Sequence, residues 1–101
     1  MNTQSKVGLE STVVAIKDQI SADLAGEIAI LNVKSGIYYG LNPVGASVWK
    51  LIQEPKTVSQ VRDALLKEYD VQAERCEKDL LNLLERLEEE KLVELRNETP
   101  S

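Results

Sequence analysis

At Asn42-Pro43 the spacing of apolar residues changes from the two-residue period of strands to the 3.6-residue period of helices. This change indicates a sheet followed by helices. Before it, short apolar and β-branched runs typical of strands occupy residues 12–16, 27–33 and 37–41. A turn containing Gly36 separates the last two runs and predicts a hairpin between them. We therefore expect the three runs to form an antiparallel three-stranded meander, with residues 37–41 as its third strand.

Two helices are expected directly after the period changes. Asn42 can cap a helix and Pro43 suits the first helical position, so the first helix begins there and ends before Pro55. Thr57 and Gln60 have the spacing of a capping box, which predicts the start of the second helix. These start signals depend on neighbouring residues only, and they therefore specify the helices without reference to the rest of the chain.

A third helix is expected from about Ala73 to Glu90. Its apolar residues fall within one arc at helical spacing. This arc comprises Ala73, Cys76, Leu80, Leu83, Leu84 and Leu87, with Leu81 on its shoulder. Residues 92–95 are expected to add a last short strand.

The resulting order, β-β-β-α-α-α, predicts an α+β fold in a winged-helix-like arrangement, a three-stranded antiparallel sheet followed by a three-helix bundle. A chain of 101 residues has room for one hydrophobic core. We expect one domain at residues 11–95, preceded by a flexible lead-in at residues 1–10 and followed by a polar tail at residues 96–101.

The composition excludes several kinds of active site. The chain has no histidine and a single cysteine, Cys76, so Ser-His-Asp and Cys-His centres, cysteine zinc sites and an internal disulfide are excluded. Cys76 lies on the apolar arc of the third helix, where a thiol acts as a small apolar side chain. No glycine-rich phosphate loop is present. We therefore expect no catalytic residue, no metal and no cofactor, and a protein that is not an enzyme.

The charge distribution disfavours nucleic acid as a partner. The net charge is −5, and the acidic excess lies in residues 68–101, which carry five Lys/Arg and eleven Asp/Glu. A helix-turn-helix reading would place the third helix against DNA, but the polar residues on that helix are mostly acidic and would repel phosphate. A DNA-binding regulator is therefore kept only as the less favoured alternative.

The sequence has no membrane-spanning signal. No apolar run approaches the roughly 18 residues that a membrane-spanning helix requires. The first six residues, Met-Asn-Thr-Gln-Ser-Lys, lack a hydrophobic signal core. We therefore expect a cytoplasmic protein that does not bind membranes.

The third strand offers a place for a partner. Residues 37–41 contain neither proline nor lysine, which would blunt an exposed strand edge. An extended peptide can add to such an edge through its backbone. Alternatively, Tyr38 and Tyr39 are ordinary strand aromatics, and the strand pattern alone favours neither interpretation.

One flank of the third helix suits the same partner. Leu83 lies on that flank with Asp79 and Arg86 beside it, which combines an apolar strip with charges at its rim. Leu84 and Leu81 are expected to pack toward the helical bundle. The alternative is that Leu83 is part of the core.

The segment from Tyr38 to Leu51, with Leu41-Asn42 followed by Gly45 and Trp49, resembles the signature of the PqqD-like family. The similarity continues through Thr57-Val58, Tyr69-Asp70-Val71, Asp79-Leu80, Leu83-Leu84 and Leu87, and covers roughly residues 13 to 95. One departure is that Leu83 or Leu84 stands where the family usually has phenylalanine, so the shape of the pocket can differ.

The resemblance implies a RiPP recognition element. Such proteins bind the leader of a ribosomally made precursor peptide as an added strand along the third strand and against the third helix. Stand-alone members serve lasso-peptide maturation, where they present the precursor to a separate leader peptidase, or pyrroloquinoline quinone assembly. The Tyr-Tyr-Gly-Leu-Asn-Pro segment is closer to the lasso group, and the quinone branch is the alternative.

The strand, the helix flank and the resemblance together predict a peptide-binding site without catalytic residues. The expected partners are the leader peptide and a leader peptidase or other maturation enzyme. The candidate residues are Val33, Ile37, Tyr38, Tyr39, Leu41, Cys76, Asp79, Leu80, Leu83, Arg86 and Leu87.

Overall fold

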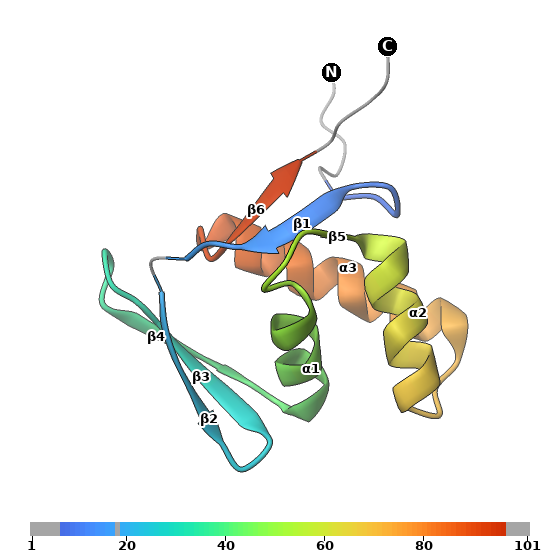
Figure 1. The fold of residues 1–101 in the computed structure, drawn as a ribbon, viewed down its shortest axis with the longest axis horizontal. Coiled ribbons are helices and arrows are strands. Elements are labelled where there is room, and N and C mark those ends of the chain that lie inside the picture. Colours follow the sequence, from blue (N-terminus) through green and yellow to red (C-terminus); the bar gives the residue numbers. More distant parts are fainter. Residues whose placement is uncertain (1–6, 18, 97–101) are drawn as a thin grey trace.

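The computed structural model describes residues 7–17 and 19–96, which form two three-stranded antiparallel sheets and three helices (Figure 1). The elements are β1 (Thr12–Ala15), β2 (Ile20–Leu24), β3 (Glu27–Asn32), β4 (Ile37–Leu41), α1 (Pro43–Leu51), β5 (Lys56–Thr57), α2 (Val58–Glu68), α3 (Ala73–Glu89) and β6 (Val93–Arg96). No helix in this part of the chain is both long and apolar enough to cross a membrane.

The meander consists of β2, β3 and β4, in that order. Ala25 and Gly26 join β2 to β3 with positive φ angles of 56° and 94°, as a tight hairpin turn requires. Three antiparallel strands therefore precede the three helices, and the α+β class is confirmed. The strand at residues 20–24 was not anticipated, because Ser21 and Asp23 dilute its apolar residues and aspartate is rare in strands.

The strand predicted at residues 12–16 exists as β1, but its assignment to the meander was wrong. β1 lies between β5 and β6 in a second sheet, where Val13 is paired with Lys56 on one side and with Leu95 on the other. The predicted last strand is confirmed as β6. The local pattern identified β1 as a strand, but its partners lie far along the chain and leave no mark on nearby residues.

The helices begin where their capping residues predicted. The Asn42 side chain accepts a hydrogen bond from the Gly45 amide at 2.8 Å, and Pro43 occupies the first turn of α1. Thr57 and Gln60 form both bonds of the capping box, at 2.9 and 3.1 Å. Both starts are therefore fixed by side chains that are close in the sequence.

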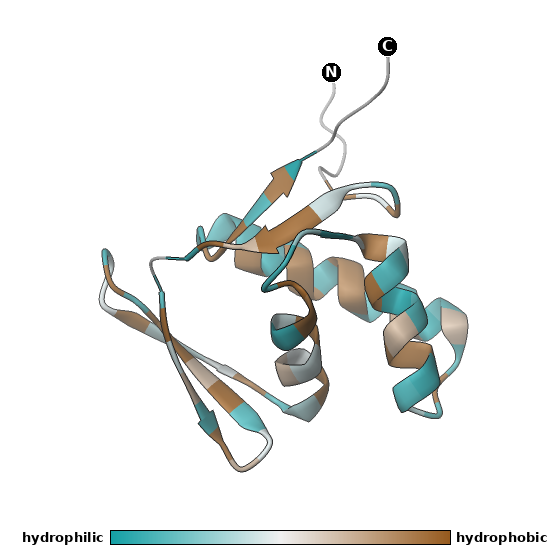
Figure 2. Ribbon diagram, viewed as in Figure 1, coloured by the Kyte–Doolittle hydropathy of each residue, from teal (hydrophilic) through white to brown (hydrophobic). Residues whose placement is uncertain are grey.

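The core lies where the three helices meet the two sheets. Trp49 of α1, Ile30 of β3, Val13 of β1 and Leu84 of α3 are each at most 4% exposed. Figure 2 shows apolar residues along β1 and along α3, which passes behind it. α1 lies between the meander and the other two helices, so it connects the meander to the rest of the core.

The packed chain begins earlier than the expected boundary at residue 11. Val7 is buried in the core, and the Leu9 carbonyl accepts a hydrogen bond from the Ser59 amide at 3.1 Å. Val7 and Leu9 of the expected lead-in therefore pack against the domain, whereas residues 1–6 of that lead-in lie outside the described residues. At the other end, Arg96 belongs to β6, and residues 97–101 also lie outside.

Candidate functional site

A groove of about 830 Å³ separates α3 from the junction of β4 and α1. Three parts of the chain line it: the end of β4 with the first half of α1, the end of α2 with the following linker, and one flank of α3. The lining residues are Gly40, Leu41, Asn42, Val44, Gly45, Val48, Leu65, Tyr69, Val71, Gln72, Arg75, Cys76, Asp79, Leu80 and Leu83.

The α3 wall has an apolar base and a charged rim. Cys76 and Leu80 are buried at the base, and Leu83 is half-buried beside them. Arg75 and Asp79 are exposed and form an ion pair one helical turn apart, with Nε and Oδ2 at 3.6 Å. This flank therefore offers an apolar strip bordered by charges of both signs.

The opposite wall depends on a close approach between β4 and α1. A side chain at Gly45 would place its Cβ 3.2 Å from the Leu41 Cβ, so glycine allows the first turn of α1 to lie against the end of the strand. Val44, next to Gly45, lines the groove and is 41% exposed. Val44 therefore offers an apolar surface to the groove.

Tyr69 and Val71, which follow α2, also line the groove. The Tyr69 hydroxyl lies 2.9 Å from the Ser47 hydroxyl and 3.3 Å from the Pro43 carbonyl, which ties this segment to α1. Val71 is 48% exposed and lines the same groove. Two exposed valines, Val44 and Val71, thus contribute to its apolar surface.

The strand beside the groove has an open edge. β4 is the last strand of the meander, and among residues 7–17 and 19–96 no strand pairs with its second edge. In an antiparallel pair, successive N–H groups of a strand point to alternate sides. Of Tyr38 and Tyr39, one therefore donates toward β3 and the other toward the open edge. A peptide that added to this edge would pass Gly40 and Leu41, which line the groove.

The sequence matches the family model described as Coenzyme PQQ synthesis protein D (PqqD) over residues 27–93. The chain belongs to the PqqD family. The family resemblance seen in the sequence is thereby confirmed. The matched segment runs from β3 through α3 and into β6, and it therefore contains every residue that lines the groove.

A solved structure has the same fold as this PqqD-family protein. It is described as TbiB1 in complex with the TbiA(beta) leader peptide, and the two share 30% sequence identity with a TM-score of 0.73. The match covers 86% of this chain and 99% of the TbiB1 chain. A search of curated proteins found no match.

The structure brings five of the predicted site residues into the groove of this PqqD-family protein. These are Leu41, Cys76, Asp79, Leu80 and Leu83. Leu84, expected to pack toward the bundle, is fully buried, whereas Leu83 is half-buried and lines the groove. The two flanks of α3 thus differ in their surroundings as the helical spacing indicated.

The other six predicted residues lie outside the groove. Leu87 is buried in the core, and Arg86 is exposed on α3 beyond the groove. Val33, Ile37 and Tyr38 are exposed along β4 and the turn before it. Side chains alternate between the two faces of a strand, so Ile37 and Tyr38 lie on opposite faces of the meander.

Tyr39, in the middle of β4, contacts the C-terminal end of α3. The interaction of its hydroxyl with the Glu90 carboxylate raises the pKa of Tyr39, and burial adds to the effect. Asn32 on the neighbouring strand donates from Nδ2 to the Glu90 carbonyl at 3.0 Å. The contacts of Tyr39 are therefore structural in this arrangement.

Sequence reasoning missed ten of the fifteen residues that line the groove. Val44, Tyr69, Val71 and Arg75 are among those it omitted. The available signal was that Val44 and Val71 are apolar residues at the boundaries of helices. Such positions are poorly suited to a helical core face and are close to the loops that carry function.

The groove has few chemically reactive side chains. Burial raises the pKa of the Cys76 thiol, so the thiol is protonated at neutral pH and is a poor nucleophile. Among the described residues, no three His, Cys, Asp or Glu side chains are grouped so that they could hold a metal ion. The geometry is that of a surface that binds, and its apolar lining suits a peptide with apolar anchors.

Proposed function

We propose that this protein is a non-catalytic recognition protein that binds the leader of a ribosomally synthesised precursor peptide and presents it to a separate leader peptidase. The observation that carries the proposal is an unpaired strand edge, that of β4, beside an apolar groove bounded by α3. The likeness to TbiB1, solved with a leader peptide, supports it.

The leader adds to β4 as a fourth strand of the meander. Backbone hydrogen bonds to the open edge hold it, and alternate side chains turn toward the helices. Apolar anchors among them enter the groove and pack on Leu83, Val44 and Val71. The Arg75–Asp79 pair at the rim fixes the position of the peptide along the groove.

The chemistry on the bound peptide belongs to another protein in this proposal. The groove has a buried, protonated thiol and an exposed ion pair but no activated nucleophile. Recognition and cleavage are thus divided between two chains, both of which we place in the cytoplasm. The precursor is of the lasso-peptide type, as the Tyr38–Pro43 segment suggests by its resemblance.

A second candidate is peptide recognition in the biosynthesis of coenzyme PQQ. The family model that matches residues 27–93 carries that description. In this case the same edge and groove bind the precursor of the quinone cofactor, and a different enzyme receives it. The two candidates share the site and differ in the peptide.

Calorimetric titration tests the proposal and separates the two candidates. The purified protein is titrated with the leader of the lasso precursor encoded near its gene, with a quinone-cofactor precursor, and with a scrambled leader. Saturable binding of the lasso leader alone supports the proposal, and binding of the quinone precursor alone supports the second candidate. If both natural peptides bind no better than the scrambled one, both candidates are wrong.

Presentation to the peptidase needs a separate measurement. The cleavage rate of the full precursor by the peptidase is compared with and without this protein. We expect faster cleavage in its presence, and we expect Val71→Asp, which places a charge in the groove, to remove the gain. An unchanged rate with the wild-type protein would contradict presentation while leaving leader binding intact.

A further inference from the structure

The C-terminal end of α3 is fixed to the core. Lys91 has a φ angle of 63°, and the Leu92 amide donates to the Leu87 carbonyl at 2.9 Å, which closes the end of the helix. Leu92 is fully buried, and its carbonyl accepts from the amide of Ile16, which follows β1, at 3.0 Å. Glu90 is the C-cap residue, and the last carbonyls of a helix have no partner within the helix. The Glu90 carbonyl is therefore an acceptor at a fixed position.

The Asn32 side chain joins this end of α3 to the turn between β3 and β4. Its Nδ2 donates to the Glu90 carbonyl at 3.0 Å. Its Oδ1 accepts from the amides of Lys34 and Ser35 at 3.0 and 3.2 Å. Asn32 is 8% exposed, and burying an amide without such bonds would destabilise the fold. One side chain therefore shapes the turn and attaches it to α3.

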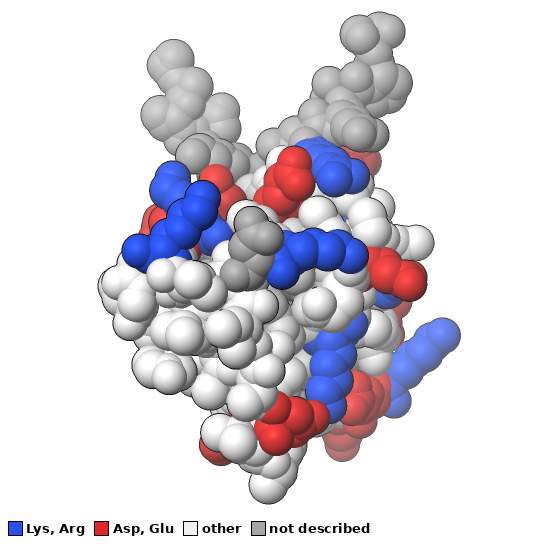
Figure 3. Space-filling view, turned by 60° about the vertical axis from the view of Figure 1, so that its left-hand side comes forward, with Lys and Arg blue, Asp and Glu red and all other residues white. Residues whose placement is uncertain are grey.

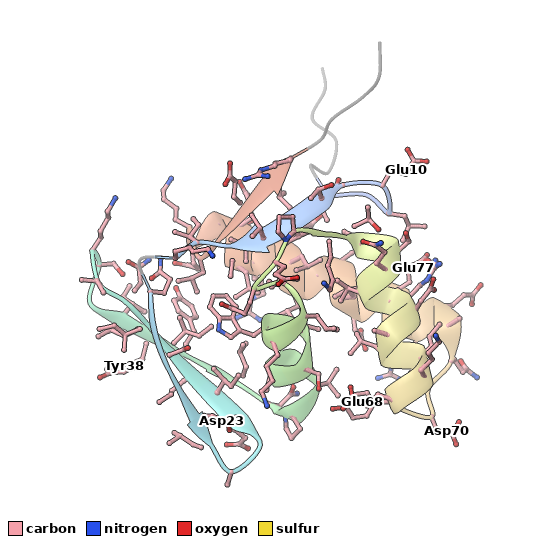
Figure 4. The ribbon with its side chains drawn as sticks, viewed as in Figure 1. Glu10, Asp23, Tyr38, Glu68, Asp70 and Glu77 are labelled. Carbon is pink, nitrogen blue, oxygen red and sulfur yellow. The ribbon has the colours of Figure 1, made fainter. Side chains whose placement is uncertain are left out.

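Tyr39 interacts with the same residue from β4. Figure 4 shows Tyr38 on the side of the sheet that faces away from the helices. Side chains alternate along a strand, so Tyr39 lies on the face toward the helices. It is half-buried against the core, and its hydroxyl interacts with the Glu90 carboxylate. Two neighbouring strands are thus attached to one residue at the end of α3. We call Asn32, Tyr39 and Glu90 the Glu90 latch.

Exposed charges surround the Glu90 latch but do not replace it. Lys34 in the turn, Lys91 next to Glu90, and Arg86 one helical turn before it are all exposed. Figure 3, turned toward the meander, shows basic and acidic side chains along the upper border of this face and a broad uncharged surface below them. Exposed ion pairs contribute little to stability, and salt screens them. The hydrogen bond of the buried Asn32 amide is therefore the stronger connection between the turn and α3.

The opening between β4 and α3 is held at both ends of the strand. β4 runs from the turn to the start of α1 (Figure 1). At the α1 end, Gly45 allows the helix to lie against Leu41. At the turn end, the Glu90 latch holds the hairpin against α3. A strand that adds to β4 lies about 4.8 Å from it, so its side chains reach α3 only over a narrow range of spacings.

We propose that Asn32 is a positioning residue for leader binding: through Glu90 it holds the β3–β4 hairpin at the distance from α3 that the added strand requires. The proposal rests on the function proposed above. Asn32 itself does not touch the leader, because it is buried and belongs to β3, which lies between β2 and β4. Opening the latch releases the hairpin, and the affinity for the leader falls with the fraction of molecules that keep the hairpin in place.

Two substitutions open the Glu90 latch with little other change. Asn32→Asp keeps the side-chain oxygen that shapes the turn and removes the Nδ2 donor to the Glu90 carbonyl. Tyr39→Phe removes the hydroxyl and keeps the ring. Val93→Ala is the stability control, because Val93 is buried in the other sheet and does not line the groove.

Three measurements are made on the full chain of each variant. Urea unfolding gives its stability and shows the conditions under which it is fully folded. Surface plasmon resonance under those conditions gives the association and dissociation rates of the leader of the precursor encoded near its gene. Without peptide, the nuclear Overhauser effect between the Tyr39 ring and the Glu90 side chain reports whether the latch is closed in the Asn32→Asp variant.

We expect Asn32→Asp to bind the leader about three- to tenfold more weakly, the range for one hydrogen bond. The loss should lie in slower association with an unchanged dissociation rate, because fewer free molecules are competent while the complex keeps its contacts. The Overhauser effect between Tyr39 and Glu90 should weaken. Tyr39→Phe should slow association about threefold or less, since its hydroxyl is the more exposed partner. Val93→Ala should keep both rates within about twofold, because it is remote from the site.

Several results would overturn the positioning role of Asn32. Normal association of Asn32→Asp would do so, whether or not its Overhauser effect persists. Faster dissociation with normal association would assign Asn32 to contacts within the complex. Equal slowing by Val93→Ala would make the effect one of stability. If Asn32→Asp does not fold, normal association of Tyr39→Phe decides against the latch. If the wild-type protein binds no leader, the proposed function itself fails, and the positioning role fails with it.

Discussion

The two sheets of this protein have three strands each and opposite surroundings. In the β5-β1-β6 sheet, Val13 and Ala15 of the central strand and Val93 of β6 are at most 4% exposed. In the β2-β3-β4 sheet, every residue of β2 is exposed and β4 has an open edge. The first sheet joins segments from the two ends of the described chain, whereas the second is built from consecutive hairpins.

This difference indicates that the β5-β1-β6 sheet stabilises the fold, whereas the β2-β3-β4 sheet has the strand edge that a peptide can reach. The β5-β1-β6 sheet is part of the core, so its strands are expected to open only when the whole domain unfolds. The meander packs on α1 through one face, whereas β2 is exposed and the second edge of β4 pairs with no strand among the described residues. A peptide-binding strand must have unpaired backbone groups, and the protein can leave them open because its stability comes from the other regions.

The largest expected effect comes from placing the same charge in each sheet. Val13→Lys buries an unpaired cation in the core and should destabilise the domain by roughly 3–5 kcal/mol, enough to unfold many domains of this size. Ile20→Lys should cost less than about 0.5 kcal/mol, because the position is exposed. Urea unfolding followed by circular dichroism measures both. Similar losses of stability from the two variants would contradict the claim that only the β5-β1-β6 sheet is part of the core.

The next effect concerns two neighbouring leucines of α3. Leu84→Ala should cost about 2–5 kcal/mol of stability, because the side chain is fully buried. Leu83→Ala should cost less than about 2 kcal/mol but weaken leader binding about tenfold, because the side chain lines the groove. Urea unfolding and calorimetry are run on both variants. Suppose instead that Leu84→Ala lost binding while staying folded and that Leu83→Ala unfolded. The Leu84 flank of α3 would then bind the leader, and the Leu83 flank would belong to the core.

A proline scan tests the open edge of β4. Tyr38→Pro and Tyr39→Pro each remove one backbone N–H, and the two groups point to opposite sides of the strand. One variant should therefore keep the folded spectrum and lose most of its leader affinity. The other should lose pairing with β3 and destabilise the meander. Normal folding and normal binding in both variants would rule out strand addition at β4.

The smallest effect is expected at the rim of the groove. Asp79→Asn releases the Arg75 guanidinium from its ion pair and should weaken leader binding about two- to threefold, the range for exposed pairs. The difference should shrink as salt is raised. Arg86→Gln is the control, because Arg86 is exposed on α3 outside the groove. A larger loss from Arg86→Gln would move the charged rim of the site toward the end of α3.

Features that depend on neighbouring residues were predictable from the sequence. The caps at Asn42 and Thr57 fixed the starts of two helices, and the turn at Gly36 specified the β3–β4 hairpin. The spacing of leucines on α3 separated Leu83 from Leu84. All of these signals act over a few residues.

Features that depend on distant residues were not predictable. β1 pairs with a strand about eighty residues further along, and an apolar run carries no record of its partner. The groove is formed where three separated segments meet, so Val44 and Val71 become part of one surface only after folding. The weak pattern at residues 20–24 hid β2 because one of its faces is polar and the other is exposed.

Amide hydrogen exchange, resolved by residue with and without the leader, tests the central claim that a peptide adds to the open edge of β4. We expect the amides of β4 that point to the open edge to exchange fast in the free protein and slowly in the complex. The amides of β1 should be protected in both states, since they lie in the core sheet. Unchanged exchange along β4 in a saturated complex would contradict strand addition and place the leader elsewhere on the protein.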